Sequence, residues 1–82
     1  MQYEVLLKPR AIKDLTSIPK DDASRIVEKL ELARNNLSGE IKKLTNFEPN
    51  YRLRVGNWRV LFEIDNNKIE VYRILHRKEA YR

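Results

Sequence analysis

The apolar and polar residues in the first half of the chain follow a mainly helical pattern. Residues 2–7 alternate and then become apolar, which predicts a first strand. Apolar residues recur at helical spacing from Pro9, which suits the first turn of a helix, to Pro19, which ends this helix and begins the next. The second helix starts with aspartates, as its dipole favours, and Asn35, Asn36 and Gly39 stop it. One apolar face results, made of Ala11, Ile12, Leu15, Ile18, Ala23, Ile26, Val27, Leu30 and Ala33.

The second half of the chain is rich in strand patterns. Residues 51–55, 58–64 and 68–75 are three strand candidates. Two-residue turns join them: Gly56-Asn57 suits a type II′ turn, and Asn66-Asn67 is compatible with type I′. The order β-α-α-β-β-β predicts an α+β, two-layer domain in which a helical hairpin packs on a mainly antiparallel sheet. With 82 residues, the chain has room for a single domain, residues 1–82.

A tight turn at Gly56-Asn57 determines which side chains share a face of the first hairpin. Val55 then pairs with Trp58, and Arg54 pairs with Arg59. One face is apolar and suits the helices; it carries Tyr51, Leu53, Val55, Trp58, Val60 and Phe62. The opposite face carries Arg52, Arg54, Arg59 and Leu61. We therefore expect three arginines together on the sheet face that the helices do not cover.

Directly opposed arginines are unusual in a sheet that serves stability alone. Like charges facing each other across two strands cost on the order of a few tenths to 1 kcal/mol. A phosphate between them reverses the sign, because guanidinium groups bind phosphate oxygens through paired hydrogen bonds. Alternatively, the arginines extend into water or pair with Glu63, Glu70 or Glu79. We take the phosphate site as the working hypothesis.

The last strand candidate does not alternate cleanly. Simple alternation from the Asn66-Asn67 turn places Ile69, Val71 and Arg73 on the apolar face. The arginine face then receives Glu70, Tyr72, Ile74 and His76. Because a cation is unfavourable among core residues, we expect a β-bulge or a strand end near Val71.

Composition and charge narrow the function further. The net charge is +5 and the pI about 9.7. Residues 1–40 are neutral, whereas residues 41–82 hold ten Lys/Arg against five Asp/Glu. This asymmetry favours a polyanion-binding face, most often for nucleic acid, although a basic surface without a specific ligand is the alternative. The candidate nucleic-acid-binding residues outside the arginine row are Lys42, Lys43, Lys78 and Arg82.

Absent residue types exclude several other classes. The chain has no cysteine and one histidine, so we expect no disulfide, no thiol chemistry, no metal site and no cofactor. No apolar run approaches 18 residues, and the N-terminal apolar stretch is too short for a signal peptide. We therefore expect a cytoplasmic protein that does not insert into membranes.

The C-terminal sequence HRKEAYR contains further candidate chemistry. His76 can act as an acid or a base near neutral pH, although a lone histidine is more often structural. Arg77 and Tyr81 are four residues apart and share a side of a helical turn. Tyr81 can stack on an unpaired RNA base, or it simply packs the tail.

These motifs together resemble the RelE/ParE toxin superfamily of bacterial and archaeal toxin–antitoxin modules. The resemblance is carried by Lys43-Leu44, by the run from Tyr51 to Arg59, and by the ending from His76 to Tyr81. It covers nearly the whole chain, and residues 8–19 also look like the first helix of the family. It implies that the first strand lies beside the last one.

Similarity to the RelE branch implies an mRNA endoribonuclease that acts in the ribosomal A site without a metal. In that chemistry the ribose 2′-OH attacks the neighbouring phosphate and the 5′-oxygen leaves. By this resemblance Arg59 binds the scissile phosphate, Arg77 lies near the leaving oxygen, and Tyr81 orients the mRNA. Arg52 and Arg54 stand where the family pattern has lysines. Because arginine cannot serve as a base, His76 is the first candidate for that role and Glu48 the second.

The same resemblance implies binding partners and leaves two alternative functions open. A cognate RelB-like antitoxin is expected to wrap this domain, which acts as a monomeric toxin in that complex, and mRNA on a 70S-type ribosome is the expected substrate. A ParE-like inhibitor of DNA gyrase is the first alternative function. A basic nucleic-acid-binding module without catalysis is the second.

Overall fold

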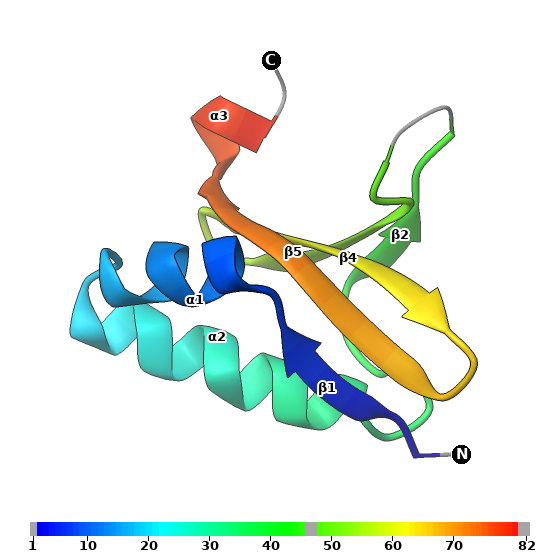
Figure 1. Ribbon diagram of the computed structural model, residues 1–82. Helices are drawn as coiled ribbons and strands as arrows, with labels where there is room; N and C mark the ends of the chain where they lie inside the picture. The colour runs from blue at the N-terminus through cyan, green and yellow to red at the C-terminus, as the bar shows by residue number, and fades with distance from the viewer. Residues whose placement is uncertain (1, 46–47, 81–82) are drawn as a thin grey trace.

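The computed structural model describes residues 2–45 and 48–80 and shows a two-layer α+β domain (Figure 1). Its elements, in chain order, are β1 (Glu4–Leu7), α1 (Pro9–Thr16), α2 (Lys20–Ala33), β2 (Ile41–Lys43), β3 (Tyr51–Val55), β4 (Trp58–Asp65), β5 (Lys68–His76) and α3 (Arg77–Ala80). Helices α1 and α2 lie against one face of the sheet, and α3 rises on the opposite side, at the end of β5 (Figure 1). The predicted fold class is confirmed. We call the face opposite α1 and α2 the helix-free face.

The sheet has five strands in the order β1-β5-β4-β3-β2. β1 is parallel to β5, whereas the other neighbours are antiparallel, which confirms that the first strand lies beside the last. β2 was not predicted, whereas α3 lies where a terminal helical turn was considered from Arg77 onward. The three residues of β2 include a single apolar one, Ile41, so they carry no readable alternation.

The predicted register of the β3–β4 hairpin is confirmed at every position. Val55 pairs with Trp58 and Arg54 with Arg59, and the pairing continues to Tyr51 and Phe62. The turn places Gly56 at φ +57°, as expected. The second turn differs from the prediction, because Asn66 has φ +57° while Asn67 is not left-handed, and a type I′ turn needs both.

A bulge in β5 resolves the problem of Arg73. Leu61 pairs with Arg73 and Phe62 with Val71, so Tyr72 is the extra residue. Beyond it, Arg73 moves to the helix-free face, and Ile74 enters the core with 2% exposure. The expected bulge is therefore confirmed.

The bulge also makes part of the predicted placement wrong. Simple alternation put Ile74 and His76 on the arginine face. The extra residue reverses the alternation, so Ile74 pairs with Val60 and His76 with Trp58.

The core lies between the two layers. Its buried residues are Ala11, Ile18, Ile26, Leu30, Ala33, Leu53, Val55, Val60, Phe62, Ile69, Val71 and Ile74. Ile12 and Val27 were predicted on the buried face, but they are 49% and 44% exposed. Each follows a fully buried neighbour, Ala11 or Ile26, and one residue turns a helix by about 100°, so both fall outside the narrow contact stripe. No helix in the described part of the chain has the length and apolarity to cross a membrane.

Candidate nucleic-acid interface

The arginine row lies on the helix-free face, as predicted. Partners in an antiparallel pair share a face, so Leu53 and Val60, which are fully buried, mark the core side. Arg52, Arg54 and Arg59 therefore belong to the opposite side. Lys42 joins them, because it pairs with Arg52 across β2 and β3. Four cationic side chains from three adjacent strands thus share one end of this face, which we call the hairpin-tip end.

Arg59 is the buried member of the row. Its exposure is 5%, and its Nη1 donates hydrogen bonds to the carbonyl oxygens of Gly56 at 2.8 Å and Trp58 at 2.9 Å. Both acceptors belong to the tight turn and its exit, so the turn geometry fixes the guanidinium plane. The result is a preorganised cation beside exposed ones.

Arg54 and Arg52 differ in exposure. Arg54 is exposed, and its Nη1 lies 3.7 Å from Oε2 of Glu40, the residue just before β2. Arg52 is half-buried and pairs across the strands with Leu61. An exposed ion pair of this length contributes little, on the order of a few tenths of a kcal/mol.

These contacts change the interpretation of the opposed arginines. Arg59 turns toward backbone carbonyls and Arg54 toward Glu40, so the protein itself relieves the repulsion between them. The opposition therefore does not require an anion. The case for an anion site rests instead on the number of cations that converge at this end of the sheet.

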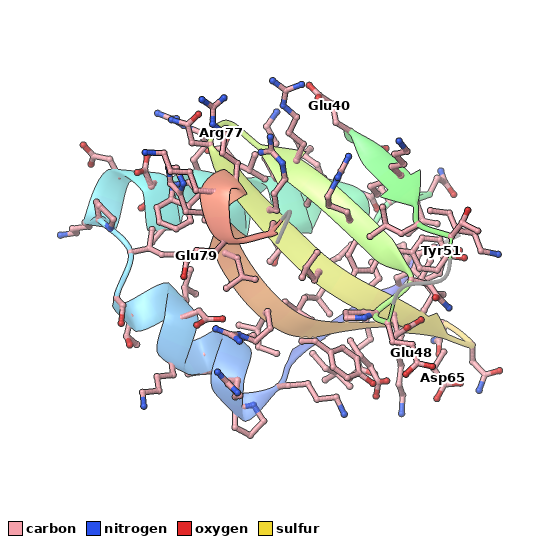
Figure 2. All side chains as sticks on the ribbon, turned by 90° about the horizontal axis from the view of Figure 1, so that it is seen from above. Glu40, Glu48, Tyr51, Asp65, Arg77 and Glu79 are labelled. Carbon is pink, nitrogen blue, oxygen red and sulfur yellow. The ribbon has the colours of Figure 1, made fainter. Side chains whose placement is uncertain are left out.

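Arg77 reaches the same end from a distant part of the chain. Its backbone N–H donates to the Asn57 carbonyl oxygen at 2.8 Å, which ties the start of α3 to the β3–β4 turn. Arg77 is exposed and lies along one edge in the view onto the helix-free face (Figure 2). The fold thus brings the backbone of Arg77 to the turn that anchors the Arg59 guanidinium.

His76 is the last residue of β5 and pairs with Trp58, so it lies on the row of the core side and not in the arginine row. Its ring meets Trp58 edge-on, with centroids 5.4 Å apart, and its Nδ1 accepts a hydrogen bond from the Lys78 N–H at 3.3 Å. An Nδ1 that accepts leaves the proton of the neutral ring on Nε2. In this tautomer Nε2–H is a hydrogen-bond donor, and the ring's free lone pair, on Nδ1, is the one that accepts from the Lys78 N–H. This contact by itself favours neither an acidic nor a basic role for His76.

The remaining predicted site residues do not all lie with the arginine row. Lys43 pairs with Tyr51 on the core side, with its Nζ 6.0 Å from the ring centroid, so it does not join the arginine row. Lys78 is exposed on α3. Glu48, the second candidate base, is exposed and lies far from Arg77 (Figure 2). Tyr81 and Arg82 lie outside the described residues.

The other end of the helix-free face, near the β4–β5 turn, is acidic. Glu63 pairs with Glu70, and Asp65 pairs with Lys68. Glu63 accepts a hydrogen bond from the Asn50 N–H at 2.8 Å. We call this the acidic end. Within residues 2–45 and 48–80, no three His, Cys, Asp or Glu side chains gather as metal ligands.

A clamp at the sheet edge supports the hairpin-tip half of β5. Asp14 of α1 accepts hydrogen bonds from Arg73 Nε at 2.7 Å and Nη2 at 3.1 Å, and from the Ile74 N–H at 3.0 Å. Burial alone raises the pKa of Asp14. The hydrogen bonds from Arg73 and Ile74 and the charges of Arg73 and Arg10 outweigh burial and hold this pKa below its ordinary value. The Asp14 hydrogen bond likewise raises the pKa of Arg73.

Sequence reasoning missed several residues of this region. Glu40 and Asp14 carried no local signal, because their partners Arg54 and Arg73 are distant in the sequence. Arg25 of α2 looked like an ordinary exposed helix residue. In the structure its Nη1 lies 3.8 Å from the position of an ideal Cβ on Gly56.

Comparison with known proteins identifies the family. A sequence model described as the ParE toxin of the type II toxin–antitoxin system parDE matches residues 5–81. The chain belongs to the RelE/ParE toxin family. Toxin RelE3 of Methanocaldococcus jannaschii is 35% identical over 83 residues, which cover 95% of this chain and 94% of the relative.

Solved structures of RelE/ParE toxins agree with this fold. The toxin–antitoxin complex RelB–RelE from Methanococcus jannaschii matches with a TM-score of 0.77 and 35% identity, covering 93% of this chain and 94% of that one. The complex RelBE2 from Mycobacterium tuberculosis also gives 0.77, at 27% identity, covering 93% and 99%. The protein is therefore a type II toxin with a RelE-like fold.

Proposed function

We propose that this toxin is an endoribonuclease that cuts mRNA in the A site of a 70S-type ribosome. The observation that carries the proposal is that Arg52, Arg54 and Arg59 share the helix-free face, while the backbone of Arg77 is tied to the Gly56-Asn57 turn. Several cations, one of them fixed, suit a crowded, dianionic phosphorane-like transition state. The relatives at 35% identity are named RelE, which supports the same proposal.

The proposed reaction is an internal transesterification. The ribose 2′-oxygen attacks the adjacent phosphorus, and the bond from phosphorus to the 5′-oxygen breaks. A 2′,3′-cyclic phosphate and a free 5′-OH result. The 2′-OH loses a proton to a base, and the 5′-oxygen gains one from an acid. Guanidinium groups supply the positive charge that the transition state needs, in place of a metal ion.

The described residues divide these tasks in the following way. Arg59, anchored by the Gly56 and Trp58 carbonyls, stabilises charge on the phosphate from a fixed position. Arg54, which is exposed, contacts a non-bridging oxygen. His76, at the end of β5 on the Trp58 row, is the proposed proton-transfer residue: the neutral ring takes the proton of the 2′-OH, and the resulting imidazolium returns a proton to the leaving 5′-oxygen. Tyr81 is proposed to orient the mRNA, as the resemblance implies.

We also propose a cognate RelB-like antitoxin as partner. The solved complexes of the 35% and 27% identical toxins each contain an antitoxin. An acidic, amphipathic segment complements the cations of the hairpin-tip end. Such a segment competes with RNA for the same charges.

Inhibition of DNA gyrase is the second candidate, because the matching family description names ParE. One experiment separates the two functions. A defined mRNA is translated in vitro with the toxin, and its 5′ ends are mapped by primer extension, with a parallel assay of gyrase supercoiling. Ribosome-dependent cuts at the A-site codon support the proposal. Inhibited supercoiling without cuts overturns it.

The role of His76 has its own test. His76→Gln keeps a polar side chain but removes the imidazole ring. If His76 transfers the proton, the cleavage rate falls by about 100-fold or more. Cleavage at the wild-type rate removes His76 from the mechanism while leaving the arginines in place.

A further inference from the structure

The charge division of the helix-free face limits the path of any bound polyanion. Cations of β2, β3 and β4 gather at the hairpin-tip end, whereas Glu63 and Glu70 oppose each other at the acidic end. Asp65, at the end of β4, adds a carboxylate well away from Arg77 (Figure 2). Carboxylates repel a phosphate backbone. Repulsion therefore disfavours a path in which a polyanion bound at the hairpin-tip end continues along this face toward the β4–β5 turn.

The β3–β4 turn offers a different way off the face. Gly56 has φ +57° and no side chain, so no side-chain atom obstructs the tip of the hairpin at this position. Arg77 begins α3 beside this turn, through the hydrogen bond of its N–H to Asn57 O. On the other side of the turn, Nη1 of Arg25 lies 3.8 Å from the position of an ideal Gly56 Cβ. Arg25 belongs to α2, which packs under the sheet, so cations flank the turn from both layers.

Arg25 is only weakly engaged by its own helix. Its Nη1 lies 3.9 Å from Oδ1 of Asp22, and its side chain is 59% exposed. An exposed pair at positions i and i+3 contributes about 0.2–0.5 kcal/mol. This is less than a guanidinium gains from a phosphate, which it can bind through two parallel hydrogen bonds.

We propose that the RNA strand leaves the helix-free face over the Gly56-Asn57 turn and that Arg25 binds a phosphate of its backbone there. The inference rests on the proposed function for the identity of the polyanion as RNA. It adds the direction of the strand and a binding residue from the helical layer. The phosphate belongs either to the mRNA strand or to ribosomal RNA, and the chemistry of recognition is the same.

The test measures binding rather than cleavage. A fluorescent 12-nucleotide RNA with 2′-O-methyl groups, which cannot undergo transesterification, is titrated with toxin at several KCl concentrations. Arg25→Gln is expected to weaken binding by about 3- to 10-fold and to reduce the slope of log K against log salt by about 0.7. The matched control is Lys20→Gln, the same charge change at an exposed position of the same helix. It leaves affinity and slope close to the wild-type values.

Two further arms identify the source of the phosphate and the direction of the path. If Arg25→Gln weakens co-sedimentation with ribosomes but not oligonucleotide binding, the phosphate is ribosomal. Glu70→Gln, at the acidic end, is expected to change affinity by less than about twofold. The inference is overturned if Arg25→Gln behaves like Lys20→Gln in both arms. It is also overturned if Glu70→Gln has the larger effect, or if no RNA binds.

Failure of this inference and failure of the proposed function are distinguishable. A toxin that binds RNA through Arg25 but cuts none refutes the nuclease and keeps the path. A toxin that cuts mRNA but in which Arg25→Gln binds RNA as Lys20→Gln does keeps the nuclease and refutes the path. Thermal unfolding of each variant shows that fold is retained, because exposed substitutions change stability by about 0.5 kcal/mol or less.

Discussion

The two ends of the helix-free face contain the same electrostatic problem and resolve it differently. Arg54 opposes Arg59 at the hairpin-tip end, and Glu63 opposes Glu70 at the acidic end. Arg59 is buried against two backbone carbonyls of its own turn, while its partner extends toward Glu40. Glu63 instead accepts a hydrogen bond from a neighbouring loop, from the Asn50 N–H.

The comparison teaches that opposed like charges are not by themselves a sign of a ligand. Both pairs are relieved inside the protein. What distinguishes the hairpin-tip end is that cations from separate elements, including Arg77 of α3, converge on it and that one of them is fixed. Convergence and preorganisation, rather than repulsion, indicate a site for a phosphate.

The largest expected effect follows from removing the fixed cation. Arg59→Ala is expected to lower the rate of mRNA cleavage by about 100-fold or more. It also lowers the free energy of unfolding by about 0.5–1.5 kcal/mol, because the carbonyls of Gly56 and Trp58 lose a hydrogen-bond donor. In vitro translation with primer extension and chemical denaturation measure the two effects.

A matched pair of variants separates activity from folding. Arg54→Ala removes an exposed cation, so it lowers cleavage while stability changes by about 0.5 kcal/mol or less. Glu70→Ala removes a charge at the acidic end and leaves the cleavage rate within about twofold. Equal losses from Arg54→Ala and Glu70→Ala would contradict the distinction between the ends.

The next largest effect is on stability and concerns the contacts along the outer edge of each half of β5. Before the bulge, β5 pairs with β1, but beyond it Asp14 of α1 binds Arg73 and the Ile74 N–H. Asp14→Ala is expected to cost about 1–3 kcal/mol, because a buried N–H loses its acceptor. Hydrogen exchange should accelerate at Ile74 while Ile69, next to β1, stays protected. Uniform acceleration along β5 would show that the two halves are not held separately.

The same clamp makes the hairpin-tip half sensitive to acid. The pKa of Asp14 in the folded protein lies below its ordinary value of 3.8, mainly because the hydrogen bonds and charge of Arg73 outweigh burial. Its stabilisation is therefore fully present above pH 3.8 and is lost as the pH falls through the lower folded-state value. Asp14→Asn should remove this part of the acid dependence in denaturation curves measured between neutral and acidic pH.

The turns at the two ends provide a smaller test. Both first turn residues are left-handed, but one is Gly56 and the other is Asn66. Gly56→Ala is expected to cost about 1–2 kcal/mol, since a Cβ is unfavourable at this φ. Asn66→Gly should be neutral or gain up to about 1 kcal/mol for the same reason. Changes of opposite sign in the unfolding free energy, measured by urea denaturation, support the positive φ at both residues. A stabilising Gly56→Ala refutes it.

The smallest effect is expected from the acidic pair itself. Glu70→Thr removes the repulsion with Glu63 and places a β-branched residue in a strand. The gain in unfolding free energy is about 0.2–1 kcal/mol. A loss of stability in this variant would mean that Glu70 has a favourable partner that outweighs Glu63.

Local patterns in the sequence were enough to determine the hairpin and the class of the fold. A two-residue turn at Gly56-Asn57 allows one register, and the alternation from Tyr51 to Phe62 then assigns both faces. The basic second half and the C-terminal motif identified the family that the comparisons established. These features depend on neighbouring residues, which is why they can be read from the chain.

Only the tertiary structure decided the rest of the site. The position of the bulge at Tyr72, which moved His76 to the Trp58 row, depends on how β5 meets both β4 and α1. The burial of Arg59 and the approach of Arg25 to Gly56 depend on the packing of distant elements. Alternation propagates from a turn only until an extra residue resets it, and contacts between distant residues leave no periodic signal. The sequence therefore determined which cations share a face, and packing determined which of them is fixed.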